Sequence, residues 1–532
     1  MANNTRAGGW LCAAAAAALL AGSAAIPPTA DTQDPGVQVT LGPAQTVDLR
    51  TAPELPAVVR PADLAINRPT MPMADYIAAK NAARAAPPGH TKPGAGAVSP
   101  SSTNVTLFGQ VAGPNQAQAG GLPPDGDIAT SKEWMVQVVI DLVTMYNWNT
   151  NAFKQVNLET LFQNSAFVRF DPRVIHDPYW DRFVVLADAC SPCSGTSTQS
   201  VFALAISQTN DPTGSWWIYG VPLNTNPGDF ADFPQLGIDL NSLIFTSNVF
   251  TASNTVTTKT FSIAKAYLYN GFGASYFLFG GSSCTVAPPY VLDNSATAYV
   301  LAFCPGDNKV SIGSLTNTGL SAANLHWDNT VTVAKFGIPP QASQPGVNYP
   351  LDTGDNRFEN RSLQVGSRII NTATINDNTI PAPAFFTFDI GATPHTLVAE
   401  GVWFAAGHSN DWHPSIVANT VAVPTGSVLG EVFVTWMSTN PTGNINLQLR
   451  AGGGLGDNPS IGNGIPVFTS SLPLTNQTDA AGIHRSGDYT YITTYPAAAL
   501  GCLADEVGIL TGEVAAATAG LWSTRVGIVK RC

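Results

Sequence analysis

The stretch from Phe170 to Pro222 alternates short apolar runs with turn sequences. Its first two runs flank Asp177–Pro178, and its last two flank Asp211–Gly214. An Asp-Pro pair favours a turn because Asp can bond to its own backbone and Pro fixes φ. We therefore expect four antiparallel strands joined by turns, which is the composition of one β-propeller blade.

The same texture continues over the rest of the chain from Thr103. Short runs rich in Val, Ile and Phe alternate with Gly, Pro, Asn and Asp, and amphipathic helical patterns are almost absent. About 430 residues of this kind exceed one sandwich, whereas propellers carry 4–8 four-stranded blades. The sequence predicts an all-β protein, with a β-propeller of six or seven four-stranded blades over residues 103–532.

Residues 1–25 have the features of a secretory signal peptide. Arg6 precedes the apolar run Leu11–Gly22, and Ser23–Ala25 offers small residues for cleavage. This run is too short to span a membrane, and no later segment has ~18 uninterrupted apolar residues. An Ala-rich helix of the folded domain is the alternative. We expect a secreted protein, extracellular or periplasmic, without a membrane span.

Residues 26–102 differ from the rest because Pro, Ala and Gly dominate them. Such a segment buries too little apolar surface to offset its ordering entropy, so we expect a disordered linker or pro-segment. Met73 to Ala86 is the exception, with a sequence that could form a short helix. A transient helix in a linker is the preferred interpretation, and a pro-segment or docking element is the alternative.

Charged residues make up only 11% of the chain, against a typical ~25%. The formal net charge is −12, so the basic surface that nucleic-acid binding requires is missing. The same charge disfavours binding to an anionic membrane surface. We expect a monomer whose partner is a glycan or an extracellular protein.

Six of the seven cysteines lie beyond the predicted signal peptide, an even number that favours disulfides in an exported chain. Proximity in sequence suggests three pairs. They are Cys190 with Cys193, Cys284 with Cys304, and Cys502 with Cys532. A zinc site at Cys190 and Cys193 is the rival interpretation, but no second pair of ligands is evident.

Several segments resemble uncharacterised secreted bacterial β-propeller proteins of the sialidase-like superfamily of six- or seven-bladed propellers. The segments are PPDGD followed by WMVQVV, FDPRVIHDPYWDRF, SQTNDPTGSWWIY, DFPQLGID with FTSNVF, WHPSI, RSGDYTYITTYP and WSTRV. They occur in the order typical of that group, from about Thr103 to Cys532. Ser486 stands where the group has Trp. The resemblance implies a secreted propeller but no established activity.

Acidic positions also resemble those of five-bladed glycoside hydrolases. That resemblance implies Asp171 as general base, Glu400 as general acid and Asp232 as an orienting group. An inverting pair of carboxylates stands ~6.5–9.5 Å apart across the substrate. The blade number expected here differs from that of those enzymes.

Aspartates recur at the start of predicted first strands, and the innermost strands of a propeller line its channel. Carboxylates gathered there could bind Ca²⁺, which takes 6–8 oxygen ligands. Asp125, Asp127 and Asp488 are the candidate ligands. The alternative is that each Asp accepts backbone N–H bonds in its own turn.

Three tryptophans, Trp180, Trp217 and Trp412, could stack on sugar rings, with packing in the blade core as the alternative. No nucleophile elbow or phosphate-binding loop is present. The leading hypothesis is a secreted, non-catalytic β-propeller scaffold that binds an extracellular glycan or protein. The alternative is a glycan-active hydrolase that uses Asp171, Asp232 and Glu400.

Overall fold

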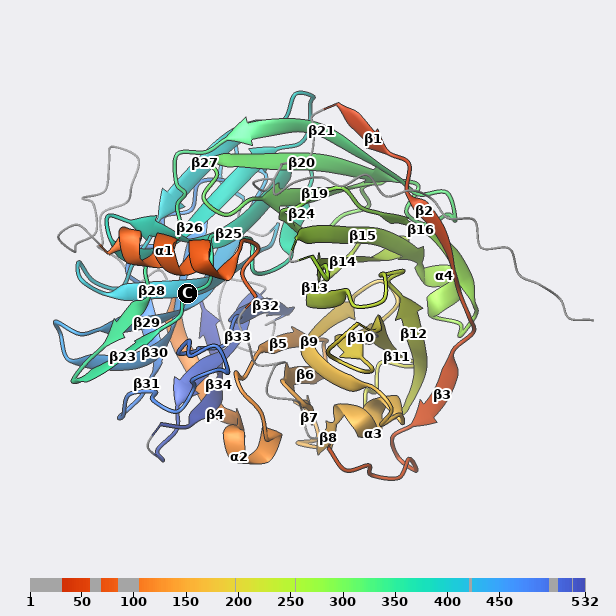
Figure 1. The fold of residues 1–532 in the computed structure, drawn as a ribbon, viewed down its shortest axis with the longest axis horizontal. Coiled ribbons are helices and arrows are strands. Elements are labelled where there is room, and N and C mark those ends of the chain that lie inside the picture. Colours follow the sequence, from red (N-terminus) through yellow and green to blue (C-terminus); the bar gives the residue numbers. More distant parts are fainter. Residues whose placement is uncertain are drawn as a thin grey trace, which may run out of the picture.

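The computed structural model describes residues 31–57, 68–84, 105–196, 198–253, 255–420, 423–496, 506–518 and 520–531. Antiparallel sheets of short strands make up most of this part of the chain, so the predicted all-β class is confirmed. The sheets are arranged around a common centre, as in a propeller (Figure 1). None of the helices in the described ranges has the length and apolar character of a membrane span.

The stretch from Phe170 to Pro222 forms four antiparallel strands that lie in chain order within one sheet, as predicted. The strands are β9 (Val168–Asp177), β10 (Arg182–Cys190), β11 (Ser200–Ser207) and β12 (Ser215–Pro222). The turn after β9 is set by Asp177, whose Oδ1 accepts the backbone N–H groups of Tyr179 and Trp180. The turn before β12 is set in the same way by Asp211 and Thr213.

Two further four-stranded sheets are built from consecutive strands. The first contains β5 (Gly126–Thr130), β6 (Trp134–Val139), β7 (Leu142–Asn147) and β8 (Phe153–Asn157). The second contains β28 (Asn410–Ala418), β29 (Glu431–Asn440), β30 (Ile445–Leu455) and β31 (Ile465–Thr469).

A ten-stranded sheet contains two antiparallel groups joined by parallel pairing on both sides of β18 (Pro289–Val291). One group is β13 (Phe230–Ile238), β14 (Ser242–Phe250), β15 (Val256–Ala264) and β16 (Ala274–Phe279). The other is β24 (Ser362–Val365), β25 (Arg368–Asp377), β26 (Ile380–Asp389) and β27 (Thr396–Val402). Beside them lie β17 (Thr285–Ala287), β19 (Thr297–Phe303), β20 (Lys309–Thr316) and β21 (Asn324–Thr332).

The last sheet joins the two ends of this array. It contains β32 (Tyr491–Pro496), β33 (Glu506–Ala515), β34 (Trp522–Lys530) and β4 (Thr106–Asn115), and β4 pairs antiparallel with β34. The remaining elements are the hairpin β22 (Ala342–Gln344) and β23 (Val347–Leu351) and three short helices, α2 (Gln116–Ala119), α3 (Leu158–Phe162) and α4 (Lys265–Leu268). The inner strands contact one another around the centre, from β5 through β9, β13, β18, β24, β25, β28 and β32 back to β5.

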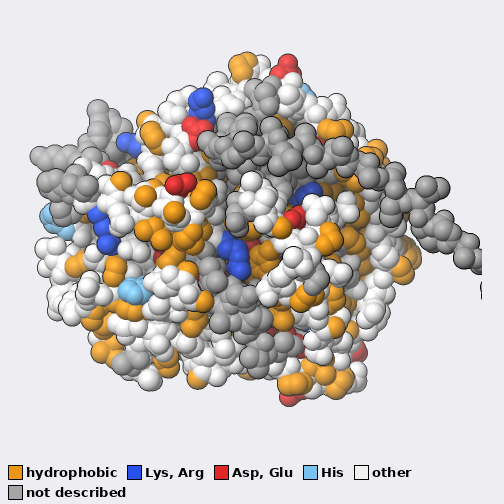
Figure 2. Space-filling model, viewed as in Figure 1, with side chains coloured by type: hydrophobic (Ala, Val, Ile, Leu, Met, Phe, Trp, Pro, Cys, Tyr) orange, Lys and Arg blue, Asp and Glu red, His pale blue; other side chains and the backbone are white. Residues whose placement is uncertain are grey.

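Apolar side chains fill the spaces between the faces of neighbouring sheets. One cluster lies between β9–β12 and β13–β16 and includes Phe202, Phe245 and Phe261, whose rings pack on one another. On the face shown in Figure 2, charged side chains are scattered singly among apolar and uncharged ones. The sheets therefore hold together by apolar face-to-face packing, which leaves the centre free for polar residues.

The expectation of disorder over residues 26–102 is wrong for 31–57 and 68–84. The strands β1 (Thr32–Asp34), β2 (Val37–Leu41) and β3 (Gln45–Asp48) run along the rim of the molecule (Figure 1). They pair with the outer strands β21, β16 and β12 and so cover three exposed sheet edges. The helix α1 (Met73–Ala83) is docked on the propeller, which contradicts the preferred linker interpretation and matches the alternative of a docking element.

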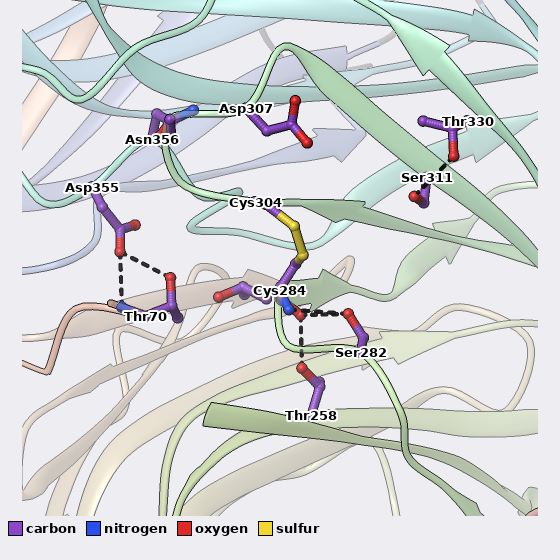
Figure 3. The surroundings of a disulfide bond; sticks show 12 residues. Thr70, Thr258, Ser282, Cys284, Cys304, Asp307, Ser311, Thr330, Asp355 and Asn356 are labelled. Carbon is purple, nitrogen blue, oxygen red and sulfur yellow. Dashed lines mark hydrogen bonds between the residues drawn. A yellow bond between two sulfur atoms is a disulfide. The ribbon is translucent and has the colours of Figure 1, made fainter. Parts of the chain in front are cut away.

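Two of the three predicted disulfides are confirmed. Cys190 is bonded to Cys193 and Cys284 to Cys304, with Cα–Cα distances of 4.9 and 4.6 Å. Figure 3 shows the second bond beside Asn356, which accepts a hydrogen bond from the backbone of Gly306 just after Cys304. Cys502 and Cys532, like the predicted signal peptide, lie outside the described residues.

Candidate active site

Three of the inner strands contain the same irregularity, a residue with positive φ directly before a proline. Asp171 on β9, Phe233 on β13 and His413 on β28 have φ values of 49°, 63° and 48°. In each case the pairing with the next strand also shifts register nearby. Positive φ is uncommon and strained for residues other than glycine, and such strain gathers at functional sites. The bulges bend the inner strands where they face the centre.

Four aspartates from different parts of the chain meet beside these bulges. Burial raises the pKa of Asp171 to about 7, and the nearby charges of Asp232 and Asp488 add to the shift. Burial raises the pKa of Asp125 well above its ordinary value, with further contributions from Asp488 and Asp171. Asp125 also accepts the backbone N–H of Asp488. Tyr489, next to Asp488 in the chain, donates to Asp171 and packs on Phe233, the neighbour of Asp232, so these contacts bring the four aspartates together.

An aromatic pair and an arginine lie against this group. The Tyr489 hydroxyl donates to Asp171 Oδ2 at 3.2 Å, and the Tyr489 and Phe233 ring centroids lie 5.1 Å apart. The Arg173 guanidinium lies 3.5 Å from the centroid of the Tyr489 ring, in a cation–π contact. A fifth acidic group, Asp188, is buried, and burial together with the charge of Asp232 raises its pKa.

Solvent still reaches part of the cluster. Asp171 is partly exposed, and the side chains of Asp232 and Asp488 are 15% and 24% exposed. Asp125, Arg173 and Tyr489 are buried. The arrangement therefore presents three solvent-accessible carboxylates above a buried layer of aromatic and cationic side chains. A carboxyl with a pKa near 7 can both give and take a proton at neutral pH.

The segment 352–361, DTGDNRFENR, lies next to the cluster and has five charged residues in a chain that is only 11% charged. Arg357 pairs with Asp355, and Arg361 pairs with Asp127 at 2.9 Å. Glu359 contacts His413 Nδ1 at 2.8 Å, and its backbone carbonyl accepts from Arg173. Sequence reasoning missed this segment because it has no strand periodicity. Its local concentration of charge was the signal that could have found it.

The predicted catalytic residues separate into two places. Asp171 and Asp232 both belong to the cluster, where the charge of Asp232 adds to the rise in the pKa of Asp171. Glu400 lies on β27, the outer strand of its group, where it accepts the backbone N–H groups of Ala334 and Lys335. Pairing Glu400 with Asp171 was therefore wrong, because an outermost strand lies away from the centre.

The predicted stacking tryptophans also differ from one another. Trp412 is fully buried and donates its Nε1–H to Ser486, so it offers no ring face to a ligand. Trp180 is 39% exposed, and its ring meets the edge of Tyr269. Trp217 is partly buried and donates to the Tyr269 backbone carbonyl. Both lie near α4, not in the aspartate cluster.

The three predicted calcium ligands are engaged with protein groups. Asp127 binds Arg361 and accepts the backbone N–H of Val174, and Asp488 accepts from Arg485. Asp125 accepts from the Asp488 backbone. No set of three or more His, Cys, Asp or Glu side chains is placed to hold a metal ion within the described ranges. A calcium site remains a prediction from the sequence.

No protein-family model and no curated protein matches this chain. Among solved structures, the exo-β-1,3-galactanase of Phanerochaete chrysosporium is 13% identical, over 63% of this chain and 80% of its own, with a TM-score of 0.31. The exo-β-1,3-galactanase of Clostridium thermocellum is 11% identical, over 68% and 87%, with a TM-score of 0.30. A sialidase of Trypanosoma rangeli is 11% identical, over 62% and 53%, with a TM-score of 0.33. Likeness at this level establishes neither a family nor an activity.

Proposed function

We propose that this protein is an acid–base hydrolase of glycosidic bonds, built on a β-propeller and active outside the cytoplasm. The observation that carries the proposal is the convergence of partly exposed Asp171, Asp232 and Asp488, in which the pKa of Asp171 is raised to about 7. Neighbouring carboxyl groups with different protonation are the usual means of glycoside hydrolysis. The two disulfides support an oxidising compartment.

In the proposed mechanism Asp171 is the general acid. Its raised pKa keeps a proton on the carboxyl at mildly acidic pH, and this proton passes to the glycosidic oxygen as the C–O bond breaks. Asp232 is the base that takes a proton from the attacking water. The sequence resemblance implied that Asp171 is the general base, whereas here it is the general acid. A carboxyl that holds its proton is a poor base at the same pH.

Burial also raises the pKa of Asp232, but Arg68 and the backbone N–H of Phe233 oppose that shift. Asp232 therefore has two groups that stabilise its ionised form. The Tyr489 hydroxyl and the charge of Arg173 also favour the ionised form of Asp171, but burial and the charges of Asp232 and Asp488 outweigh them. This difference in surroundings separates the two roles.

The test is hydrolysis of a glycan panel by the full chain, read as new reducing ends, with Asp171→Asn and Glu400→Gln as variants. We expect Asp171→Asn to lose 10²–10⁴-fold in kcat, the range for a general acid. Glu400→Gln is the matched control, because it removes one carboxylate from an outer strand, and it should keep full activity. Absence of hydrolysis across the panel, or equal loss in both variants, would refute the proposal.

A glycan-binding surface outside the cluster is the second candidate. Tyr179, Trp180, Tyr267 and Phe272 are 46%, 39%, 44% and 60% exposed. Trp180 packs on Tyr269 at the end of α4, and Phe272 bonds to the Tyr267 carbonyl. Exposed aromatic rings gathered at one place suit stacking on sugars. Binding that is lost in Trp180→Ala and kept in Asp171→Asn would support this site.

A further inference from the structure

Residues 68–84 return to the centre of the propeller and are held there mainly by polar contacts. Tyr76 donates its hydroxyl hydrogen to Asp352 at 2.7 Å, and Lys80 Nζ lies 3.4 Å from the same carboxylate. Lys80 also donates to Thr353 Oγ1 and to the Gly354 carbonyl. The Thr70 N–H and hydroxyl both donate to Asp355, as Figure 3 shows.

These anchors are buried although most of the helix surface is exposed. Tyr76, Lys80 and Thr70 are 1%, 4% and 4% exposed, whereas Ile77 on the same helix is 46% exposed. Burial alone would raise the pKa of Asp352, but Lys80 and the Tyr76 hydroxyl outweigh it and hold that pKa below its ordinary value. The segment therefore supplies the positive charge that the buried carboxylate needs.

The anchored segment places Arg68 at the aspartate cluster. Arg68 Nη1 lies 3.4 Å from Asp232 Oδ2, and its guanidinium lies 4.2 Å from the centroid of the Phe230 ring. The Arg68 carbonyl accepts from Arg357, which ties the backbone to the segment 352–361. The side chains of Arg68 and Asp232 are 20% and 15% exposed, so the pair is screened less than a surface pair.

We propose that Arg68 is a positioning residue of the central site, which residues 68–84 bring onto Asp232 to hold that carboxylate ionised beside Asp171. This inference rests on the proposed hydrolase. Asp171, Asp232 and Asp488 stay partly exposed with the segment in place, so the segment completes the site without sealing it. The charges of Asp171, Asp188 and Asp488 otherwise disfavour ionisation of Asp232. Arg485 is a second cation that favours it, and the Arg357 guanidinium lies 4.6 Å from the ring centroid of the adjacent Phe233.

The test compares Arg68→Gln with Arg68→Lys and Arg84→Gln in the full chain. Arg84 is the matched control, because it lies at the exposed end of α1 and donates to the Gln341 carbonyl, not to an aspartate. The readout is the dependence of kcat/KM on pH, on the glycan found by the panel. For Arg68→Gln we expect the acidic limb to move about one unit to higher pH, because the base loses the cation that favours its charged form.

Arg68→Lys should restore most of the original pH profile, and Arg84→Gln should leave it unchanged. An unshifted acidic limb in Arg68→Gln would overturn the inference while the hydrolase itself stands. A second measurement distinguishes failure of the positioning role from failure of the hydrolase proposal. The loss of unfolding free energy caused by Arg68→Gln should shrink in an Asp232→Asn background, since the partner charge is gone. If the two substitutions are coupled but the chain hydrolyses no glycan, then Arg68 and Asp232 form only a structural ion pair. That result would refute both the hydrolase and the positioning role.

Discussion

Tyr489 and Asp171 lie 318 positions apart in the chain, yet the Tyr489 hydroxyl donates to Asp171 Oδ2 at 3.2 Å. The contact joins a residue two positions before β32 to the bulge of β9, and these two inner strands are not neighbours in sequence. A donor at this place stabilises the ionised carboxylate and so limits the rise in pKa that burial and the other aspartates cause.

Removing that hydroxyl should make Asp171 harder to ionise. In Tyr489→Phe we expect the alkaline limb of the pH–rate profile, which reports the acid, to move up from its position near pH 7. We expect kcat to fall by roughly tenfold, as for the loss of one hydrogen bond to a charged group. Tyr491→Phe is the control, because Tyr491 lies two residues after Tyr489 and its ring packs against Arg361. An alkaline limb that stays in place in Tyr489→Phe would contradict this role.

Glu513 should make the protein less stable as pH rises. Burial raises its pKa from 4.5 to about 8, against the hydrogen bond from the Gly487 backbone. Below pH 4.5 both folded and unfolded chains are protonated, and the stabilising contribution is complete. Between pH 4.5 and 8 only the unfolded chain ionises, so unfolding free energy falls by up to about 1.4 kcal/mol per pH unit.

Glu513→Gln removes that dependence, because the amide mimics the protonated acid. The unfolding free energy of Glu513→Gln, measured in urea, should exceed that of the natural chain by an amount that grows from pH 4.5 to 8 and then levels off. Glu133→Gln, at an exposed position, should show a constant difference over the same range. A Glu513→Gln difference that is equally constant would show that Glu513 is ionised in the folded protein.

Lys80→Met should destabilise the chain strongly, because it leaves Asp352 buried without its cation. Removal of one partner of a buried ion pair costs about 3–5 kcal/mol. The deficit should shrink in acid, where Asp352 takes up a proton, and most of it should be recovered in Lys80→Met with Asp352→Asn. Chemical denaturation of the three variants measures these differences, and a deficit independent of Asp352 would contradict the pairing.

The two disulfides should contribute unequally to stability. Cys284 and Cys304 are separated by 20 positions, whereas Cys190 and Cys193 are separated by three. Closing the longer loop restricts the unfolded chain more, by about 3 kcal/mol against about 1.5 kcal/mol. Double Ser replacement of each pair, followed by thermal unfolding, should therefore lower Tm more for the Cys284–Cys304 pair. Equal shifts would contradict the loop argument.

The strands of the propeller could be predicted because their turns are local. Asp177 and Asp211 accept backbone N–H groups within three residues, so the sequence around each is enough to specify the hairpin. The same reasoning fails for β1, β2 and β3, which are strands only because sheet edges formed much later in the chain accept them. Docking of helix α1 was only the alternative interpretation of its sequence, because the helix is held by Lys80 and Tyr76 and not by an apolar stripe.

The site could be predicted in part. Asp171 directly precedes Pro172 and Asp232 lies two residues before Pro234, and both lie at bulges of inner strands. Glu400 follows an apolar run of similar appearance, but its strand lies at the outer edge of the sheet. The sequence of a single strand does not specify whether that strand is an inner or an outer one. Arg68 and the segment 352–361 belong to irregular backbone whose partners are distant in sequence. Their place depends on tertiary packing alone.

The three rim strands pair in the reverse of their own order. Strand β3 pairs with residues 215–218, β2 with residues 274–278, and β1 with residues 325–327. Of the three, β1 is synthesised first and waits longest for its partner, about 15–60 s at 5–20 residues per second. As each sheet is completed, the next rim strand toward the N-terminus gains its edge. The chain can therefore wind its own leading segment around itself one sheet at a time, in the order in which it is made.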